Sequence, residues 1–271
     1  MHDMSDSFNA CGVITITTDF GHRGPFVGTM KGVILNRFSN AKIIDLTHEA
    51  FVHWPAEAGF WLERSFRYFP NGTVHLAVVD PGVGTDRSVL LVIAEQHLFL
   101  APDNGLLAGV IESCEATVIC VDEEKLTGIA LESVSATFHG RDIFAPLAAA
   151  LAAGQVLPTE LGAPTEDFIP SLIEPPNMRG GELHGIVITS DNFGNLITNI
   201  DRSELVSFKS PVVHAGGHDI PLLRTYADVA PGDLLALINS LQVVEIARAE
   251  RSAAELLGIG RGAPVLIRDA G

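Results

Sequence analysis

The sequence predicts an α/β protein, in which an N-terminal domain with a largely parallel sheet flanked by helices precedes a smaller, mainly β domain. Up to about residue 160, short apolar runs alternate with longer helix-like segments, as in parallel sheets covered by helices. A stretch rich in proline and glycine follows, and beyond it only short β-like runs remain. We place the domains at residues 1–165 and 182–271, with a linker at 166–181.

The elements of the first domain follow one another in a regular order. Residues 12–20 form an apolar run typical of a strand, and residues 24–38 carry apolar side chains at helical spacing. A second strand and a second helix are predicted at 41–48 and 53–69. Further runs continue the alternation at 72–80, 88–102, 105–113, 116–121 and 141–154.

The second domain has a different pattern. Its apolar runs are short, and turn residues separate them, which favours a sheet made of neighbouring strands. These runs lie at 183–190, 195–200, 211–216, 233–240 and 243–249.

The charge and the cysteine content of the chain limit the classes of partner and the cellular compartment that we expect. The chain has 33 Asp and Glu against 17 Lys and Arg, a formal charge of −16 that repels a polyphosphate backbone, so we expect no nucleic acid partner. We also expect neither an export signal in the polar N-terminus nor a membrane span. Cys11, Cys114 and Cys120 show no CxxC spacing, so we expect no disulfide framework and a reducing cytoplasm.

The stretch VVDPGVGTDR, residues 78–87, ends an apolar run in a turn with a proline and two glycines. Ligands gather at the carboxyl ends of parallel strands. A rigid turn there can aim Asp80 at a ligand and bring Arg87 back beside it, although a structural ion pair explains the same residues. Asp19 and Asp45 have a similar context, with helix or turn capping as the alternative.

The stretch SATFHGRDIF places His139 before a glycine and a helix-like run. Its imidazole is expected in a polar pocket at the helix start, and a purely structural role is the alternative. The chain has no HExxH or HxH spacing, and His214 and His218 stand among turn residues. We therefore expect no metal.

In the second domain, SDNFGNLITNI combines Asp191, Phe193 and Asn195 before a strand. Asparagine offers a donor and an acceptor, and an aromatic ring offers a stacking face, which suits a purine. A polar β-turn explains the same residues. Because GxxxxGK[ST] and GxGxxG are absent, we expect a purine ligand without phosphates and no phosphate-bearing cofactor.

Five motifs in order, TDFGHRGPFVGTMKGVI, VDPGVGTDR, PDNGLL, TFHGRDIFAPLAAALAAG and DNFGNLITNI, closely resemble those of the adenosine-forming S-adenosylmethionine hydrolases. This family is related to the fluorinases and chlorinases. The resemblance covers most of the chain and implies hydrolysis of S-adenosylmethionine to adenosine and methionine, without a further cofactor. It also implies a homotrimer with sites between the N-terminal domain of one subunit and the C-terminal domain of its neighbour.

Carried over by position, the resemblance implies a catalytic triad of Asp80, Arg87 and His139. It further implies that Asp19 holds the ribose hydroxyls and that Trp54 packs against the nucleoside. Related halogenases differ from this chain at Asp80 and His139, so the sequence resembles the branch that uses water.

The resemblance implies that Phe193 and Asn195 contact adenine. It places Asp191 and Ser240 near the amino and carboxylate groups of methionine. The segment after Ser240, residues 241–251, departs from the usual turn sequences of the family, and this departure bears on the methionine end and not on the triad.

The implied chemistry requires one water held in line with the sulfonium leaving group, and either Asp80 or His139 takes its proton. Two other function classes compete with this interpretation. A protein that senses S-adenosylmethionine or adenosine without turnover does not need the triad. An adenosyl halogenase needs a site that accepts an anion, which Asp80 would repel.

Overall fold

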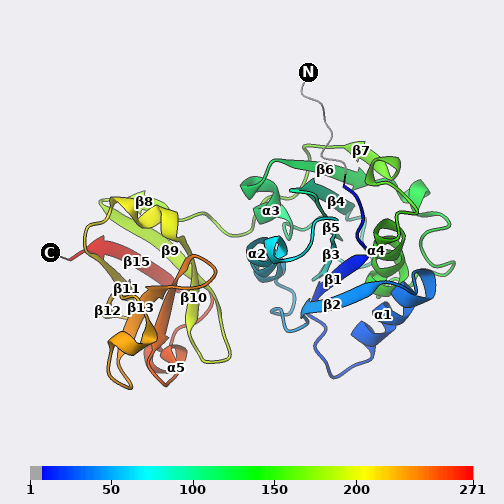
Figure 1. Ribbon diagram of the computed structural model, residues 1–271. Coiled ribbons are helices and arrows are strands. Elements are labelled where there is room, and N and C mark those ends of the chain that lie inside the picture. The colour runs from blue at the N-terminus through cyan, green and yellow to red at the C-terminus, as the bar shows by residue number, and fades with distance from the viewer. Residues whose placement is uncertain (1–7, 271) are drawn as a thin grey trace. The chain divides into compact units, whose positions relative to one another are not determined.

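The computed structural model describes residues 8–270, and the chain divides into two compact units, Met1–Ile173 and Glu174–Gly271 (Figure 1). The division falls inside the stretch predicted as a linker. Most of the N-terminal segment in which we expect no export signal lies outside the described residues. Between residues 8 and 270, no helix is long and apolar enough to cross a membrane.

The N-terminal unit is built on a seven-stranded sheet with the order β2-β1-β3-β5-β4-β6-β7. Strands β2, β1, β3 and β5 pair in parallel, whereas β5, β4, β6 and β7 pair antiparallel. The strands are β1 (Val13–Thr18), β2 (Lys42–Thr47), β3 (Val74–Val78), β4 (Val89–Ala94), β5 (His97–Pro102), β6 (Ala116–Val121) and β7 (Gly162–Pro164).

This sheet is mixed, so the prediction of a largely parallel sheet is wrong for its second half. Residues 88–102 fold back as a hairpin of β4 and β5. The two turn residues, Glu95 and Gln96, have φ values of 47° and 63°, as a type I′ turn requires. Asparagine and glycine usually mark such a turn, and this turn contains neither.

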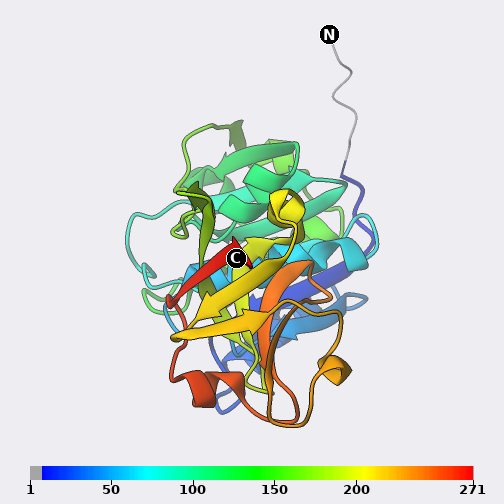
Figure 2. The same ribbon diagram turned by 90° about the vertical axis from the view of Figure 1, so that its left-hand side faces the viewer.

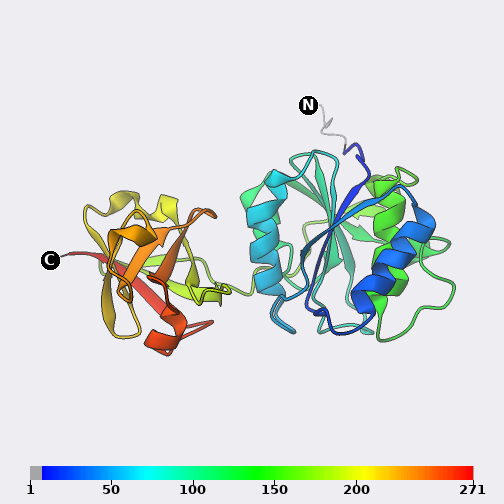
Figure 3. The same ribbon diagram turned by 60° about the horizontal axis from the view of Figure 1, so that its bottom comes forward.

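Helices lie on both faces of the sheet (Figure 3). On one face, Met30 and Ile34 of α1 pack with the alanines of α4 and with Leu76 of β3. On the other face, Leu62 of α2 and Val110 of α3 form a second buried cluster. The helices are α1 (Phe26–Arg37), α2 (Pro55–Ser65), α3 (Ala108–Ser113) and α4 (Ala145–Ala152).

Short helical turns connect these elements. A single π-helical turn, η3 (Gly140–Phe144), leads directly into α4, and such turns are frequent at functional sites. The 3-10 turns of the two units are η1 (Phe66–Tyr68), η2 (Glu123–Leu126), η4 (Pro158–Glu160), η5 (Arg202–Ser207) and η6 (Tyr226–Asp228).

The C-terminal unit is a curved antiparallel sheet with the order β12-β11-β15-β9-β10-β14-β13, and β8 pairs with β9 (Figure 2). Its two edges meet where Leu223 N donates to Ala236 O at 2.8 Å, so the sheet nearly closes into a barrel. The elements are β8 (Asn177–Arg179), β9 (Glu182–Ser190), β10 (Leu196–Asp201), β11 (Pro211–Ala215), β12 (His218–Pro221), β13 (Leu234–Ile238), β14 (Val243–Arg248), α5 (Ala253–Leu257) and β15 (Pro264–Asp269).

Two buried histidines join the central strands of the N-terminal unit. His75 Nδ1 lies 2.8 Å from Thr15 Oγ1, and its Nε2 lies 3.1 Å from His97 Nδ1. The His75 ring also stacks on Phe99, with 4.9 Å between ring centroids. Burial lowers the pKa of His75 to about 3 and lowers the pKa of His97 as well, so both rings are neutral in the folded protein near pH 7.

We expect the N-terminal unit to lose stability as the pH falls below about 6.5. Unfolded histidine binds its proton near that pH, whereas folded His75 does so only near pH 3. Between these two pH values the unfolded state holds more protons than the folded state. The free energy of unfolding therefore decreases as the pH is lowered, by on the order of a few kcal/mol in total. Denaturant unfolding at a series of pH values, followed by the fluorescence of Trp54 and Trp61, measures this free energy of unfolding.

The His75→Leu variant isolates this effect, because other groups also titrate over the window. Its free energy of unfolding should depend less on pH between 6.5 and 5 than that of the wild type. The exposed His22 provides the control, and His22→Gln should leave the slope unchanged. An unchanged slope in His75→Leu would contradict the assignment.

Candidate active site

Asp80 and Arg87 stand at the two ends of a loop that follows β3 at the carboxyl edge of the sheet. Gly84 in this loop has a φ of 80°, and a Cβ there would lie 2.4 Å from the carbonyl oxygen of Ala136. Glycine therefore allows the loop to pack against the segment that leads to His139. The predicted role of this turn, to bring Arg87 back beside Asp80, is confirmed.

The two side chains form a buried ion pair. Arg87 Nε and one terminal nitrogen both donate to Asp80 Oδ2, at 2.8 Å and 2.5 Å. The Arg87 side chain is 10% exposed and the Asp80 side chain 5%, and the guanidinium lies 5.3 Å from the centre of the Phe144 ring. One carboxylate oxygen is thus fully engaged, and the orientation of the carboxylate is fixed.

His139 completes a line of three residues. Its Nδ1 lies 3.1 Å from the Arg87 terminal nitrogen that also contacts Asp80. Because arginine can only donate, Nδ1 accepts this hydrogen bond and the ring proton resides on Nε2. Burial, reinforced by the positive charge of Arg87, lowers the pKa of His139, which favours this neutral form at pH 7.

The second oxygen of Asp80 has no partner. Asp80 Oδ1 is buried and forms no hydrogen bond with the described residues. Buried polar atoms are normally hydrogen-bonded, and an exception in a native structure needs an explanation. The acceptor capacity of this oxygen is unused, and the Asp80 residue lines a cavity.

A cavity of about 200 Å³ adjoins Asp80 and His139. Phe20, Phe26 and Phe138 form one wall, where their rings meet edge to face at centroid distances of 5.4 to 6.2 Å. The cavity is thus mainly apolar, with a carboxylate and an imidazole at one side, and this combination is typical of a small-molecule site.

Asp19 and Trp54 belong to the same edge of the sheet. Asp19 directly follows β1, which pairs in parallel with β3 up to Thr18 and Val78, so Asp19 and Asp80 follow the carboxyl ends of neighbouring strands. Asp19 Oδ2 accepts a hydrogen bond from His53 N at 3.0 Å. This contact ties Asp19 to the residue before Trp54, and Trp54 directly precedes the first residue of α2.

Contrary to the prediction from its sequence context, Asp45 does not lie at a strand end. It lies within β2 rather than after it. Lys31 Nζ is 2.6 Å from its Oδ2, and His48 Nε2 is 2.9 Å from its Oδ1. These contacts give Asp45 a structural role.

In the C-terminal unit, Asp191 organises a tight turn. Its Oδ1 accepts hydrogen bonds from Phe193 N and Asn195 N, both at 2.9 Å, and its Oδ2 accepts one from Asn195 Nδ2 at 2.9 Å. The Phe193 ring is 79% exposed. The turn thus presents an aromatic face, while the amide of Asn195 is oriented by Asp191.

Ser240 lies at the exposed tip of the β13–β14 turn, beside a buried network that the sequence analysis missed. Glu245 is 4% exposed and accepts hydrogen bonds from Tyr226 Oη at 2.6 Å and Asn239 Nδ2 at 3.1 Å. Burial, with the nearby charge of Asp191, raises the pKa of Glu245. Its one sequence signal is an acidic residue inside the apolar run VVEIA.

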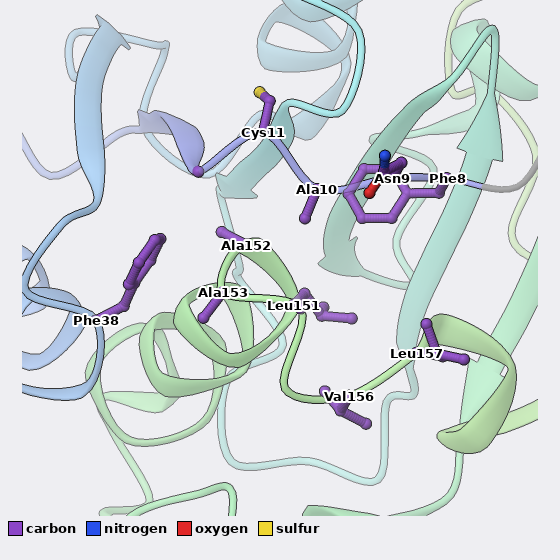
Figure 4. Close-up of a pocket in the computed structure, with 12 residues that line it drawn as sticks. Phe8, Asn9, Ala10, Cys11, Phe38, Leu151, Ala152, Ala153, Val156 and Leu157 are labelled. Carbon is purple, nitrogen blue, oxygen red and sulfur yellow. The ribbon is translucent and has the colours of Figure 1, made fainter.

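A second cavity, of about 500 Å³, shows no comparable chemistry. It lies between the segment around Phe8 and the end of α4, and alanine and leucine side chains make up much of its wall (Figure 4). Cys11 is the one titratable side chain in this wall. Within residues 8–270, no group of three or more His, Cys, Asp or Glu side chains is arranged to hold a metal ion.

Two family models match this chain over most of its length. The SAM hydroxide adenosyltransferase N-terminal domain matches residues 14–162, and the SAM hydroxide adenosyltransferase C-terminal domain matches residues 185–266. The chain belongs to the SAM hydroxide adenosyltransferase family. The resemblance recognised in the five sequence motifs is therefore confirmed.

Individual proteins agree with this family membership. An (R)-S-adenosyl-L-methionine hydrolase of Thermus thermophilus is 36% identical, over 92% of this chain and 96% of its own length. A fluorinase of Actinoplanes sp. is 31% identical, over 87% of this chain and 90% of its own length. The crystal structure of an uncharacterized conserved protein from Thermotoga maritima has a TM-score of 0.86 and 32% identity, covering 94% of this chain and 99% of that one.

The line of contacts from Asp80 through Arg87 to His139 predicts opposite responses of the His139 pKa to two substitutions. Arg87→Met removes a positive charge and should raise the pKa of His139, whereas Asp80→Asn removes a negative charge and should lower it. Titration of the His139 ring by NMR measures both. Arg67→Met, which breaks an exposed ion pair with Glu95, is the control and should leave this pKa unchanged. A fall in Arg87→Met would refute the proposed line of contacts.

Proposed function

We propose that this protein hydrolyses S-adenosyl-L-methionine to adenosine and L-methionine. The proposal rests on one arrangement, the free and buried Oδ1 of Asp80 beside a His139 ring whose Nδ1 is occupied by Arg87. The carboxylate oxygen can accept a hydrogen from water, and His139 keeps a hydrogen on Nε2 to donate to the water oxygen. Several relatives are (R)-S-adenosyl-L-methionine hydrolases by name, which supports the same reaction.

In the proposed step, water attacks C5′ of the ribose. A carbon–oxygen bond forms, the bond from C5′ to the sulfonium sulfur breaks, and its electron pair stays on the sulfur of methionine. The water proton passes to Asp80 Oδ1 and then to solvent, because Nε2 of His139 already carries a hydrogen. Sulfur leaves as a neutral thioether, so the leaving group needs no general acid.

Positioning supplies much of the acceleration in this scheme. Holding a nucleophile in line with the bond that breaks contributes up to roughly 7–11 kcal/mol in favourable cases. Arg87 contributes indirectly, since its two bonds to Oδ2 turn the other oxygen of Asp80 toward the water. The phenylalanine rings give the cavity beside this carboxylate an apolar wall.

We also propose substrate contacts for the remaining residues. Asp19 would hold the ribose hydroxyls and Trp54 would pack against the nucleoside. In the C-terminal unit, the exposed ring of Phe193 and the oriented amide of Asn195 suit adenine. The residues near the methionine amino and carboxylate groups would be Asp191 and Ser240.

An adenosyl halogenase is the second candidate, since fluorinases are among the relatives. The buried carboxylate argues against it, because an unpaired oxygen of Asp80 repels a halide at the place where the nucleophile must stand. A sensor without turnover would have no need for the line from Asp80 to His139. Water is thus the better nucleophile for this site.

We further propose a cytoplasmic homotrimer in which the N-terminal unit of one subunit and the C-terminal unit of a neighbour share each active site. Two groups of candidate substrate residues, one in each unit, support a shared site. The free cysteines support a reducing compartment. We propose that the reaction needs no metal or other cofactor, since the leaving sulfur already carries its own positive charge.

Heavy-oxygen water provides the direct test of the reaction. Because water attacks C5′, adenosine formed in this solvent should carry the label at its 5′ hydroxyl, and methionine should carry none. Mass spectrometry of both products measures it. Unlabelled adenosine, or free adenine from cleavage of the glycosidic bond, would overturn the proposal.

Two controls accompany the labelling experiment. Added chloride should not divert the product to 5′-chloro-5′-deoxyadenosine, and prior dialysis against a chelator should not reduce turnover. Asp80→Asn should lower kcat by on the order of 100-fold, because an amide cannot take the proton that the water loses. A chlorinated nucleoside as the main product would instead support the halogenase.

Complementation between two inactive variants tests the shared site. Asp80→Asn disables the N-terminal unit and Asn195→Ala the C-terminal unit. Subunits of both kinds, refolded together, should recover about a quarter of the wild-type activity, because a quarter of the shared sites combine two intact units. Each variant refolded alone is the control. No recovery in mixtures shown by sedimentation to be trimeric would place the site within one subunit.

A further inference from the structure

The motif PDNG, residues 102–105, carries no role in the proposed reaction, although it lies next to the loop that holds Asp80 and Arg87. The parallel ladder between β3 and β5 has its last pair at Leu76 and Leu100. The backbone of β3 therefore continues toward Asp80 without a strand partner on that side. A different contact must hold this part of the chain.

The side chain of Asn104 supplies that contact. Its Nδ2 donates to the carbonyl oxygen of Val79 at 2.8 Å, and Val79 is fully buried and directly precedes Asp80. The other side of the same amide is also used, because Asn104 Oδ1 accepts a hydrogen bond from Leu106 N at 3.3 Å. The amide is thus oriented, and it holds the backbone at the start of the loop of residues 80–87, called the catalytic loop below.

The preceding residue holds the other end of the loop. Asp103 N donates to the carbonyl oxygen of Ser88 at 3.0 Å, and Ser88 directly follows Arg87. The Asp103 side chain is itself anchored, since its Oδ1 accepts a hydrogen bond from Ile169 N at 2.8 Å. One short turn therefore contacts the residue before Asp80 and the residue after Arg87.

We propose that Asn104 is a positioning residue for the hydrolytic reaction: with Asp103 it clamps both ends of the catalytic loop and so sets the geometry of the Asp80–Arg87 pair. Gly105 fits this role, because it has a φ of 84° and a Cβ there would lie 2.7 Å from the carbonyl oxygen of Pro170. The backbone near Pro170 thus packs closely against this turn. This inference rests on the proposed function.

Substitution of Asn104 should lower kcat with little change in KM. Asn104→Asp keeps the size of the side chain but replaces the donor to Val79 with an oxygen, which repels that carbonyl. We expect kcat to fall by about 10- to 100-fold, as for a misplaced catalytic group, and KM to change by less than about threefold. Steady-state kinetics with S-adenosylmethionine measures both.

Asn71→Asp is the matched control, because Asn71 makes the same kind of amide contact, from Nδ2 to Gln96 Oε1 at 3.0 Å, on an exposed turn before β3. It should leave kcat unchanged. An unchanged kcat in Asn104→Asp would overturn the proposal, and so would a rise in KM alone, which would make Asn104 a substrate contact.

Asn104→Ala serves as a second variant, in case Asn104→Asp does not fold, and allows a measurement that does not need turnover. Without the clamp, Arg87 should hold His139 less closely, so the pKa of His139 should rise toward its ordinary value in an NMR titration. An unchanged pKa in folded Asn104→Ala would refute the clamp. If the wild type does not hydrolyse S-adenosylmethionine, the proposed function fails, and this titration still decides the clamp.

Discussion

The buried ion pair of Asp80 and Arg87 is the interaction on which the candidate site depends. Burying two charges is costly, and such a pair is weak evidence for a gain in stability. Its value here is geometric, because Arg87 takes up one oxygen of Asp80 and the Nδ1 of His139 at once. A single guanidinium thereby fixes a free acceptor on Asp80 and the hydrogen on His139 Nε2.

The fold holds this pair through backbone contacts more than through further charges. The glycine at position 84 allows the loop of residues 80–87 to approach the segment before His139, and the Asn104 turn contacts this loop at both ends. The π-helical turn begins at Gly140, directly after the histidine. Three segments far apart in sequence thus meet at the edge where the parallel strands end, as the sequence predicts for an α/β protein.

The sequence predicts the periodic parts of this molecule well. The first two strands and helices lie within the ranges 12–20, 24–38, 41–48 and 53–69. The sequence is less informative at positions where a single turn or a single long-range contact determines the local structure. The Glu95–Gln96 hairpin has no residue typical of its turn, and Asn104 and Glu245 act through partners distant in the chain. Asp80, Arg87 and His139 could be found because motifs mark them, whereas their tautomer and free oxygen required coordinates.

The charge of the proposed substrate explains why the carboxylate of Asp80 is paired with Arg87. The chain has a formal charge of −16, which attracts a sulfonium. Hydrolysis dissipates that positive charge, so an uncompensated anion beside C5′ would stabilise the substrate more than the transition state and slow the reaction. Arg87 offsets the charge of Asp80 at 2.5 Å but leaves Oδ1 free as an acceptor. Part of the negative charge of Asp80 thus remains at Oδ1, and the pair holds the sulfonium in its ground state less strongly than an unpaired carboxylate would.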